Sequence, residues 1–201
     1  YNEWEDTNRA LVDRLGDGQI AYTHMRDMGS EELNEFLKDM HTRTLGKKAI
    51  IIDLRYNNGG NVHNEVLEFL SQKAHYQWAY RDFPSNSHPN VTPGDIPIIA
   101  LVNERSLSDA EVTSNGIQTL GLATIVGTET YRWIIFTSGT TLLDGSYLRL
   151  PAWGCYSLDG KDLESTGVKP DIYVKNTFED RLKGRDPQLE RAIEEALKRI
   201  K

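Results

Sequence analysis

A nearly continuous apolar run at residues 49–54, Ala-Ile-Ile-Ile-Asp-Leu, constrains the fold of this chain more than any other feature. A strand with water on one side alternates apolar and polar residues, whereas a strand buried on both faces does not. Residues 96–102 form a second buried strand, and residues 123–126 form a further one. Such strands occur in sheets that carry helices on both faces, so the sequence predicts an α/β fold.

Amphipathic segments alternate with these strands. Residues 30–41 place apolar side chains at helical spacing, and Ser30 is the expected N-cap of that helix. Residues 19–25 alternate in the manner of a half-buried strand. The same reading predicts further helices at residues 62–70, 108–120 and 188–200.

The region before the last helix has a different character. Residues 131–157 are rich in Thr, Trp, Tyr and Ile and contain turn signals, which predicts short strands and turns. The expected architecture is therefore a mixed sheet flanked by helices, with a β-rich segment before the C-terminal helix. Residues 81–94 contain three prolines and several small polar residues, and we expect a surface loop there that lines a substrate groove.

The chain opens on Tyr1 and runs directly into charged, helical sequence. We therefore expect residues 1–17 to be a helix that leads in from an upstream region, and residues 18–201 to form one catalytic α/β domain. No signal sequence is readable, which leaves the compartment open between the cytoplasm and the bacterial periplasm.

Composition excludes several classes of partner. The net charge is −7 and no cluster of Lys and Arg stands out, which argues against nucleic acid. No apolar run approaches the roughly 18 residues of a membrane span. The single cysteine rules out a disulfide framework, and no histidine pair has zinc spacing, so we expect neither a metal nor another cofactor.

Two polar motifs directly follow buried strands, at the edge of an α/β sheet where ligands collect. Gly59 and Gly60 let the backbone approach a ligand and point amides outward, or they form a turn that merely needs positive φ. Ser108 and Glu111 form an S-x-x-E capping box, so Ser108 caps a helix. Capping does not exclude catalysis, because free amides beside the hydroxyl can stabilise an oxyanion.

Acidic and basic partners for a serine are less evident. Glu164 precedes a glycine-containing turn, which is typical of a solvated surface residue. A serine nucleophile needs a base within hydrogen-bond reach, and the sequence pattern does not identify any histidine as that base. His24 has the character of a structural histidine in a strand, and only His63, which opens a helix after the glycine pair, is expected near the strand ends.

Taken together, these segments resemble the tail-specific and C-terminal processing serine peptidases, and within that family the tricorn core protease branch. The order and spacing of the motifs carry the resemblance over nearly the whole chain. The motifs include Asp53-Leu54-Arg55, Asn58-Gly59-Gly60, Ser108-Asp109-Ala110-Glu111, Glu164, Gly167-Val168-Lys169-Pro170-Asp171 and Asp186-Pro187-Gln188.

The resemblance implies a crotonase-like, or ClpP-like, α/β core and a peptidase that acts through an acyl-enzyme. By motif, Ser108 is the nucleophile and Glu164 orients the catalytic apparatus. The backbone amide of Asp109 and one in the Gly59-Gly60 loop would stabilise the oxyanion. Substrates would be peptides or unfolded proteins, and the family's upstream helical and PDZ-like domains and further copies of the chain are the expected partners.

The general base separates the two branches of the family. The tail-specific branch uses a lysine about 25 residues after the serine, which here falls on Trp133, and no lysine lies between Gly127 and Ser146. The tricorn branch uses a histidine upstream of its PDZ domain. The resemblance therefore implies a histidine base outside this chain, and an isolated chain that is nearly inactive.

One departure from the family pattern supports a rival hypothesis. Residues 130–135, Thr-Tyr-Arg-Trp-Ile-Ile, stand where tricorn-like proteins are glycine-rich. Bulky residues there narrow the groove or mark a member that has lost activity. The rival is a catalytically inactive peptide-binding or scaffold domain of the same fold; acyl-CoA chemistry, which the crotonase fold also hosts, ranks below both.

Overall fold

The centre of the computed structural model, which describes residues 1–91 and 93–200, is a five-stranded parallel sheet. Its strands lie in the order β1-β2-β5-β6-β9, and each neighbouring pair is parallel. The predicted α/β class is confirmed. The strands span Ile20–His24 (β1), Ala49–Asp53 (β2), Ile98–Val102 (β5), Thr124–Gly127 (β6) and Ile172–Tyr173 (β9).

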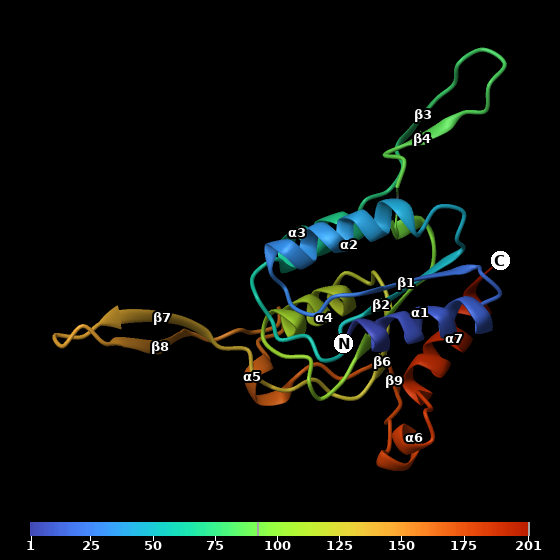
Figure 1. The fold of residues 1–201 in the computed structure, drawn as a ribbon. Helices are drawn as coiled ribbons and strands as arrows, with labels where there is room; N and C mark the ends of the chain where they lie inside the picture. The colour runs from blue at the N-terminus through green and yellow to red at the C-terminus, as the bar shows by residue number, and fades with distance from the viewer. Residues whose placement is uncertain (92, 201) are drawn as a thin grey trace.

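Two layers of helices cover the sheet (Figure 1). Helices α2 (Ser30–Thr42), α3 (His63–Leu70) and α4 (Asp109–Thr119) link successive strands of the sheet and lie together on one face. Successive strands are added in one direction, and right-handed crossovers then place every connecting helix on the same face. The opposite face is covered by α1 (Asn2–Leu15) and α7 (Pro187–Arg199).

Alternate residues of the central strands enter two separate cores. Ile50 and Ile52 of β2 pack with the layer of α2, α3 and α4, whereas Ile51 packs with α1 and α7. This arrangement is the one expected from an apolar run without alternation. Val12 of α1 is fully buried in the second core, so the predicted lead-in helix contributes directly to the packing of the sheet.

Two local predictions were wrong. All five residues of β1 are buried, because α1 covers one face of this strand and α2 lies on the other, so the strand is not half-buried. The N-cap of α2 is Gly29 rather than Ser30, which is the first helical residue. The Asp27 carboxylate accepts a hydrogen bond from the Gly29 N–H at 2.7 Å, and the neighbouring turn therefore sets the start of the helix.

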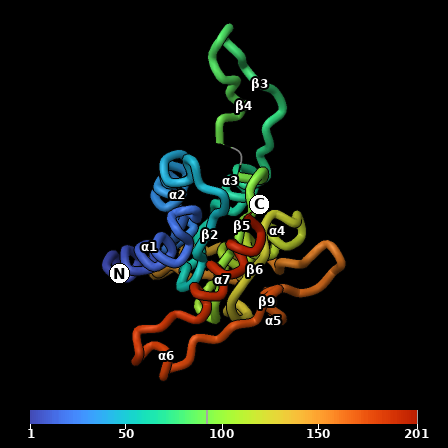
Figure 2. Tube along the Cα trace, turned by 90° about the vertical axis from the view of Figure 1, so that its right-hand side faces the viewer, coloured from blue at the N-terminus to red at the C-terminus, as the bar shows by residue number. Residues whose placement is uncertain are grey.

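Two antiparallel hairpins project from the body. The predicted short strands of the β-rich segment form one of them, β7 (Phe136–Thr141) with β8 (Tyr147–Trp153). The other pairs β3 (Tyr76–Trp78) with β4 (Asn86–His88), and it stands clear of the body in Figure 2 as well. The remaining short helices are η1 (Pro93–Asp95), α5 (Leu163–Thr166) and α6 (Phe178–Leu182).

The β3–β4 hairpin corrects the expectation for residues 81–94. The hairpin leaves the end of α3 and returns through η1 to the start of β5, so it belongs to the amino edge of the sheet. The turns that carry Gly59, Gly60 and Ser108 follow β2 and β5 and lie at the opposite, carboxyl edge. The described residues of this loop, 81–91, 93 and 94, therefore belong to the edge of the sheet opposite to Ser108.

Among the residues described, no helix combines the length and the apolar character that a membrane crossing requires.

A buried ion-pair network fixes the end of β2. The Arg55 guanidinium is almost fully buried and donates to Asp53 at 2.7 and 2.9 Å and to both carboxylate oxygens of Asp186 at 2.8 Å. Asp186 caps α7, and the ring of Trp4 in α1 lies 5.6 Å from the guanidinium carbon. Arg55 thus joins β2 to both helices of the second layer.

Removing Arg55 should destabilise the chain strongly, because it leaves the buried Asp53 carboxylate without its cation. Burial alone raises the pKa of Asp53, but Arg55 outweighs burial and holds that pKa below its ordinary value. The pair therefore stabilises the fold above the ordinary aspartate pKa, and this contribution is lost as the pH falls through the lowered one. We expect Arg55→Ala to lower the unfolding free energy by about 3–5 kcal/mol at pH 7. The loss should be smaller at pH 4, because burial alone raises the pKa of Asp53 in the variant, and the carboxyl then takes up a proton instead of staying buried as an unpaired charge.

Urea unfolding at both pH values measures this loss. The matched control is Arg14→Ala, at an exposed arginine near the end of α1, which should cost about 1 kcal/mol or less. An equal small effect for both variants would contradict the assignment.

Candidate active site

Three turns meet at the carboxyl edge of the sheet, after the neighbouring strands β2, β5 and β6. The Leu107 N–H donates to the Asn57 carbonyl oxygen at 3.1 Å, and the Ser106 hydroxyl donates to the Leu54 carbonyl oxygen at 2.8 Å. The Tyr131 N–H donates to the Ser106 carbonyl oxygen at 3.0 Å. The two motifs expected at this edge therefore lie together, and the segment after β6 joins them.

Ser108 sits on the tight turn between β5 and α4. It is half-buried at the N-cap of α4, and its φ of 55° and ψ of −120° are strained for a residue with a side chain. The predicted capping box is present, and within it the Ser108 N–H donates to Glu111 Oε2 at 3.0 Å. Ser108 caps the helix and also presents its hydroxyl at the helix N-terminus.

Gly59 packs directly against Ser108. A methyl group placed on Gly59 would lie 2.5 Å from the Ser108 Cβ and 3.1 Å from the Asp109 nitrogen, and its φ is +79°. Any side chain here would collide with the serine turn, so the position requires glycine. The Gly59 N–H donates to Asn57 Oδ1 at 2.9 Å, so this amide already has a partner. What Gly59 provides is the space that a side chain would otherwise occupy.

The amides of Gly60 and Asp109 are the other two that the sequence suggests for an oxyanion site. Asp109 is the first residue of α4, so its N–H has no partner within the helix. Gly60 lies opposite Met28 in a β-bridge whose hydrogen bonds use the Gly59 carbonyl oxygen and the Asn61 N–H. No hydrogen bond from the Gly60 N–H itself occurs among the described residues. Both amides belong to turns that meet at Ser108.

The Asp109 side chain fixes the Ser108 turn to the start of α3. Its buried carboxylate accepts hydrogen bonds from the N–H groups of Val62 and His63, at 2.8 and 3.1 Å, at the start of α3. The same carboxylate lies 2.5 Å from His63 Nδ1. Asp109 therefore links α4 to α3, the helix that follows the glycine pair. His63 lies close to the Ser108 turn through this contact.

In the described part of the chain, no hydrogen bond joins the Ser108 hydroxyl to an imidazole. His24 is structural, as predicted: its ring nitrogens hydrogen-bond with the Asp53 carbonyl oxygen at 2.8 Å and the Tyr1 hydroxyl at 2.7 Å. Burial lowers the pKa of His24, which favours the neutral ring. His41 bonds the carbonyl oxygen of Leu37 in its own helix.

Glu164 lies in α5 and is half-buried. None of the described residues donates a hydrogen bond to its carboxylate or forms an ion pair with it. The segment that follows α5 is nevertheless tied to the site, because the Val168 N–H donates to the Thr130 hydroxyl oxygen at 2.8 Å. Thr130 in turn donates to Glu111 Oε1 at 2.6 Å.

Glu111 is the site residue whose full role the sequence did not disclose. Its fully buried carboxylate accepts from four donors: the N–H groups of Ser108, Arg132 and Trp133 and the Thr130 hydroxyl. The capping-box pattern predicted only the first of these contacts. Glu111 thus joins the Ser108 turn to the segment that departs from the family pattern.

The bulky residues of that segment do not form one uniform wall. Tyr131 and Trp133 are about half exposed, and their ring centroids lie 5.7 Å apart. Ile134 is buried, and Arg132 has a φ of 72°. The backbone is fixed by Glu111, while the two aromatic rings remain at the surface.

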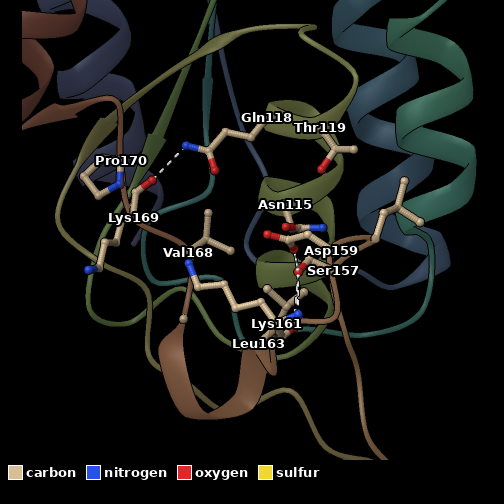
Figure 3. A pocket seen from close by; sticks show the side chains of 12 residues that line it. Asn115, Gln118, Thr119, Ser157, Asp159, Lys161, Leu163, Val168, Lys169 and Pro170 are labelled. Carbon is tan, nitrogen blue, oxygen red and sulfur yellow. Dashed lines mark hydrogen bonds between the residues drawn. The ribbon is translucent and has the colours of Figure 1, made fainter.

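Two cavities lie near these elements. One, of about 400 Å³, adjoins Ser108, because Asn58 and Leu107 in its lining directly precede Gly59 and Ser108. The other, of about 580 Å³, lies between the end of α4 and the start and end of α5 (Figure 3). The residues of α4 that line it, among them Asn115 and Gln118, are two to three helical turns from Ser108, so this cavity is separate from the Ser108 turn.

No group of three or more His, Cys, Asp and Glu side chains suited to a metal ion occurs in residues 1–91 and 93–200.

Glu111→Gln should weaken both the fold and the site. The amide keeps one acceptor oxygen and turns an NH₂ group toward N–H donors, which leaves buried groups without partners. We expect the unfolding free energy to fall by about 1–3 kcal/mol. The control is Glu68→Gln on the exposed face of α3, which should change it by less than about 0.5 kcal/mol. Urea unfolding measures both, and equal small effects would refute the role of Glu111.

Comparison with known proteins identifies the family of this chain. Residues 18–174 match the family model described as Peptidase family S41. The tricorn protease of Thermoplasma acidophilum is 31% identical over 204 residues, which cover 100% of this chain and 19% of that protein. A carboxy-terminal-processing protease of Bartonella bacilliformis is 26% identical over 86% of this chain and 43% of its own length.

The crystal structure of the tricorn protease superposes with a TM-score of 0.91, at 31% identity, and covers 100% of this chain and 20% of that one. This chain therefore spans about a fifth of the length of its tricorn relatives. The match covers the parallel sheet, its helices and the turns around Ser108. The chain belongs to peptidase family S41, as a serine peptidase domain.

Proposed function

We propose that this chain hydrolyses peptide bonds through an acyl-enzyme, with Ser108 as the nucleophile. The observation that carries the proposal is the strained Ser108 turn at the N-terminus of α4, with Gly59 packed against it. Strained backbone of this kind persists only where surrounding contacts hold it, and it clusters at active sites. Because Gly59 has no side chain, nothing on the glycine loop crowds the Ser108 turn.

In the first step, Ser108 Oγ attacks the carbonyl carbon of the scissile peptide and gives its proton to a base. The negative charge that develops on the carbonyl oxygen lies between the N–H groups of Asp109 and Gly60, beside the positive end of α4. The intermediate then expels the amine, which takes up the proton, and water releases the acid product from Ser108 by the reverse sequence. Gly59 serves by having no side chain.

We propose that the base is a histidine from outside this chain. The resemblance to the tricorn branch suggests it, and no imidazole among the described residues bonds Ser108. Glu164 is the acid that would orient this histidine, and its carboxylate is half-buried without a bonded partner in the described part of the chain. The isolated chain should then be nearly inactive, because the base contributes several orders of magnitude.

The rival function is a peptide-binding or scaffold domain without catalysis. The exposed aromatic residues Tyr131 and Trp133 beside the nucleophile turn favour it, since aromatic surfaces bind peptides well. Under this rival, peptides bind but are not cleaved in the protein at its natural length.

Proposals about the fold, the substrates and the partners accompany the main one. The sequential order of the parallel strands, with all crossover helices on one face, supports the crotonase-like name for the fold. The proposed substrates are peptides or unfolded proteins. The proposed partners are helical and PDZ-like modules of the natural protein and further copies of the chain.

Ser108→Ala in the protein at its natural length should lower kcat by about 10³-fold or more, because the oxyanion site alone retains only residual catalysis. The control is Ser71→Ala, at an exposed serine after α3, which should leave kcat unchanged. Hydrolysis of a fluorogenic peptide library is the measurement. An unchanged rate for Ser108→Ala would end the proposal, and binding without any cleavage by the wild type would favour the rival.

Glu164→Gln should lower kcat by about 10²-fold, the cost of a misplaced catalytic group, with a smaller effect on KM. The matched control is Glu179→Gln, an exposed position in α6. Equal rates for both variants would show that Glu164 has no role in orienting the base.

A further inference from the structure

The cavity beside Ser108 carries a positive charge balance in a negatively charged chain. Its lining includes Arg105 and Arg181 but only one acidic residue, Glu104. The chain as a whole has a net charge of −7, so this balance departs from the average surface. A cavity of about 400 Å³ is also within the usual size range of small-molecule and side-chain sites.

The two arginines differ in how they are held. Within residues 1–91 and 93–200, the Arg105 guanidinium forms no ion pair and no hydrogen bond, although its backbone N–H is fixed by Asn103 Oδ1 at 3.0 Å. The ion pair between Arg181 and Glu104 is long, at 3.9 Å, and both side chains are about half exposed. Glu104 is engaged elsewhere, since its Oε2 accepts from the Thr128 hydroxyl at 2.8 Å. Both guanidinium groups are therefore available to a ligand.

The position of the cavity relates it to the scissile bond. Its lining residues Asn58 and Leu107 immediately precede Gly59 and Ser108, which are in direct contact. Tyr131 forms another wall and is fixed to the same turn by its N–H bond to the Ser106 carbonyl oxygen. The cavity therefore borders the same two turns that carry Gly59 and Ser108.

We propose that the cavity binds a carboxylate of the peptide substrate, through Arg105 and Arg181. The proposal rests on the proposed function and names its substrate class. A guanidinium offers a planar fork of donors that matches a carboxylate, and two such groups in one cavity favour an anion over a neutral side chain. The carboxylate belongs either to an Asp or Glu side chain beside the scissile bond or to the free C-terminus of the peptide.

The test uses the protein at its natural length and a peptide set that varies one residue next to the cleavage site among Glu, Gln and Lys. If the carboxylate is that of a side chain, we expect kcat/KM to be about tenfold higher for Glu than for Gln, and lowest for Lys. Arg105→Gln and Arg181→Gln should each remove most of this preference. Arg105→Glu should reverse it toward Lys. The control is Arg14→Gln, at an exposed position of α1, which should keep the preference.

A second set of peptides with free or amidated C-termini separates the two sources of the carboxylate. A preference that survives amidation assigns it to the side chain, whereas a tenfold loss on amidation, removed by the arginine variants, assigns it to the terminus. Equal rates for all peptides, free and amidated alike, would overturn the proposal. So would arginine variants that slow an amidated peptide without an acidic residue as much as the others.

Peptide binding to the Ser108→Ala variant, measured by fluorescence anisotropy, separates this proposal from the proposed function. The acidic preference in binding should persist there, because the cavity does not use the Ser108 hydroxyl. A preference in binding without hydrolysis by the wild type would leave the carboxylate site standing and refute the peptidase. Hydrolysis lost in Ser108→Ala, with no preference in binding or rate, would do the opposite.

Discussion

The candidate site depends on one buried carboxylate, that of Glu111, which accepts four hydrogen bonds at 2.6–3.0 Å. A buried charge is costly unless hydrogen-bonded, and here backbone amides and one hydroxyl satisfy it. These bonds hold the strained Ser108 turn in place and attach the segment after β6 to it. Through Thr130 and Val168 the same network reaches the segment that follows Glu164. The proposed nucleophile, oxyanion amides and orienting acid are therefore connected to the same buried carboxylate.

The sheet explains why these parts meet. Strands β2, β5 and β6 are neighbours and parallel, so the three turns after them emerge at a single edge. The Arg55 network fixes the end of β2 from the opposite face, where it joins Asp53 to Asp186. The turn that carries Gly59 and Gly60 begins directly after this arginine. Packing on one face and ion pairing on the other thus set the position of the glycine loop against Ser108.

Much of this could be read from the sequence, because it depended on local pattern. The apolar runs predicted the buried strands, and the strand–turn–helix context placed Ser108 at a helix start. What failed depended on contacts between distant segments. The burial of β1 follows from covering helices, and Gly29 replaces Ser30 as N-cap because Asp27 fixes the preceding turn. The distinction between the Gly59 and Gly60 amides, and three of the four partners of Glu111, follow from tertiary hydrogen bonds that no spacing rule encodes.

Covalent labelling tests the central claim most directly. The protein at its natural length would be treated with a fluorophosphonate probe, which reacts with activated serines, and the adduct located by mass spectrometry of its peptides. The account predicts a single major adduct on Ser108, with labelling slowed when a peptide substrate competes. An active peptidase whose adduct lies on another residue, with Ser108 unmodified, would contradict it.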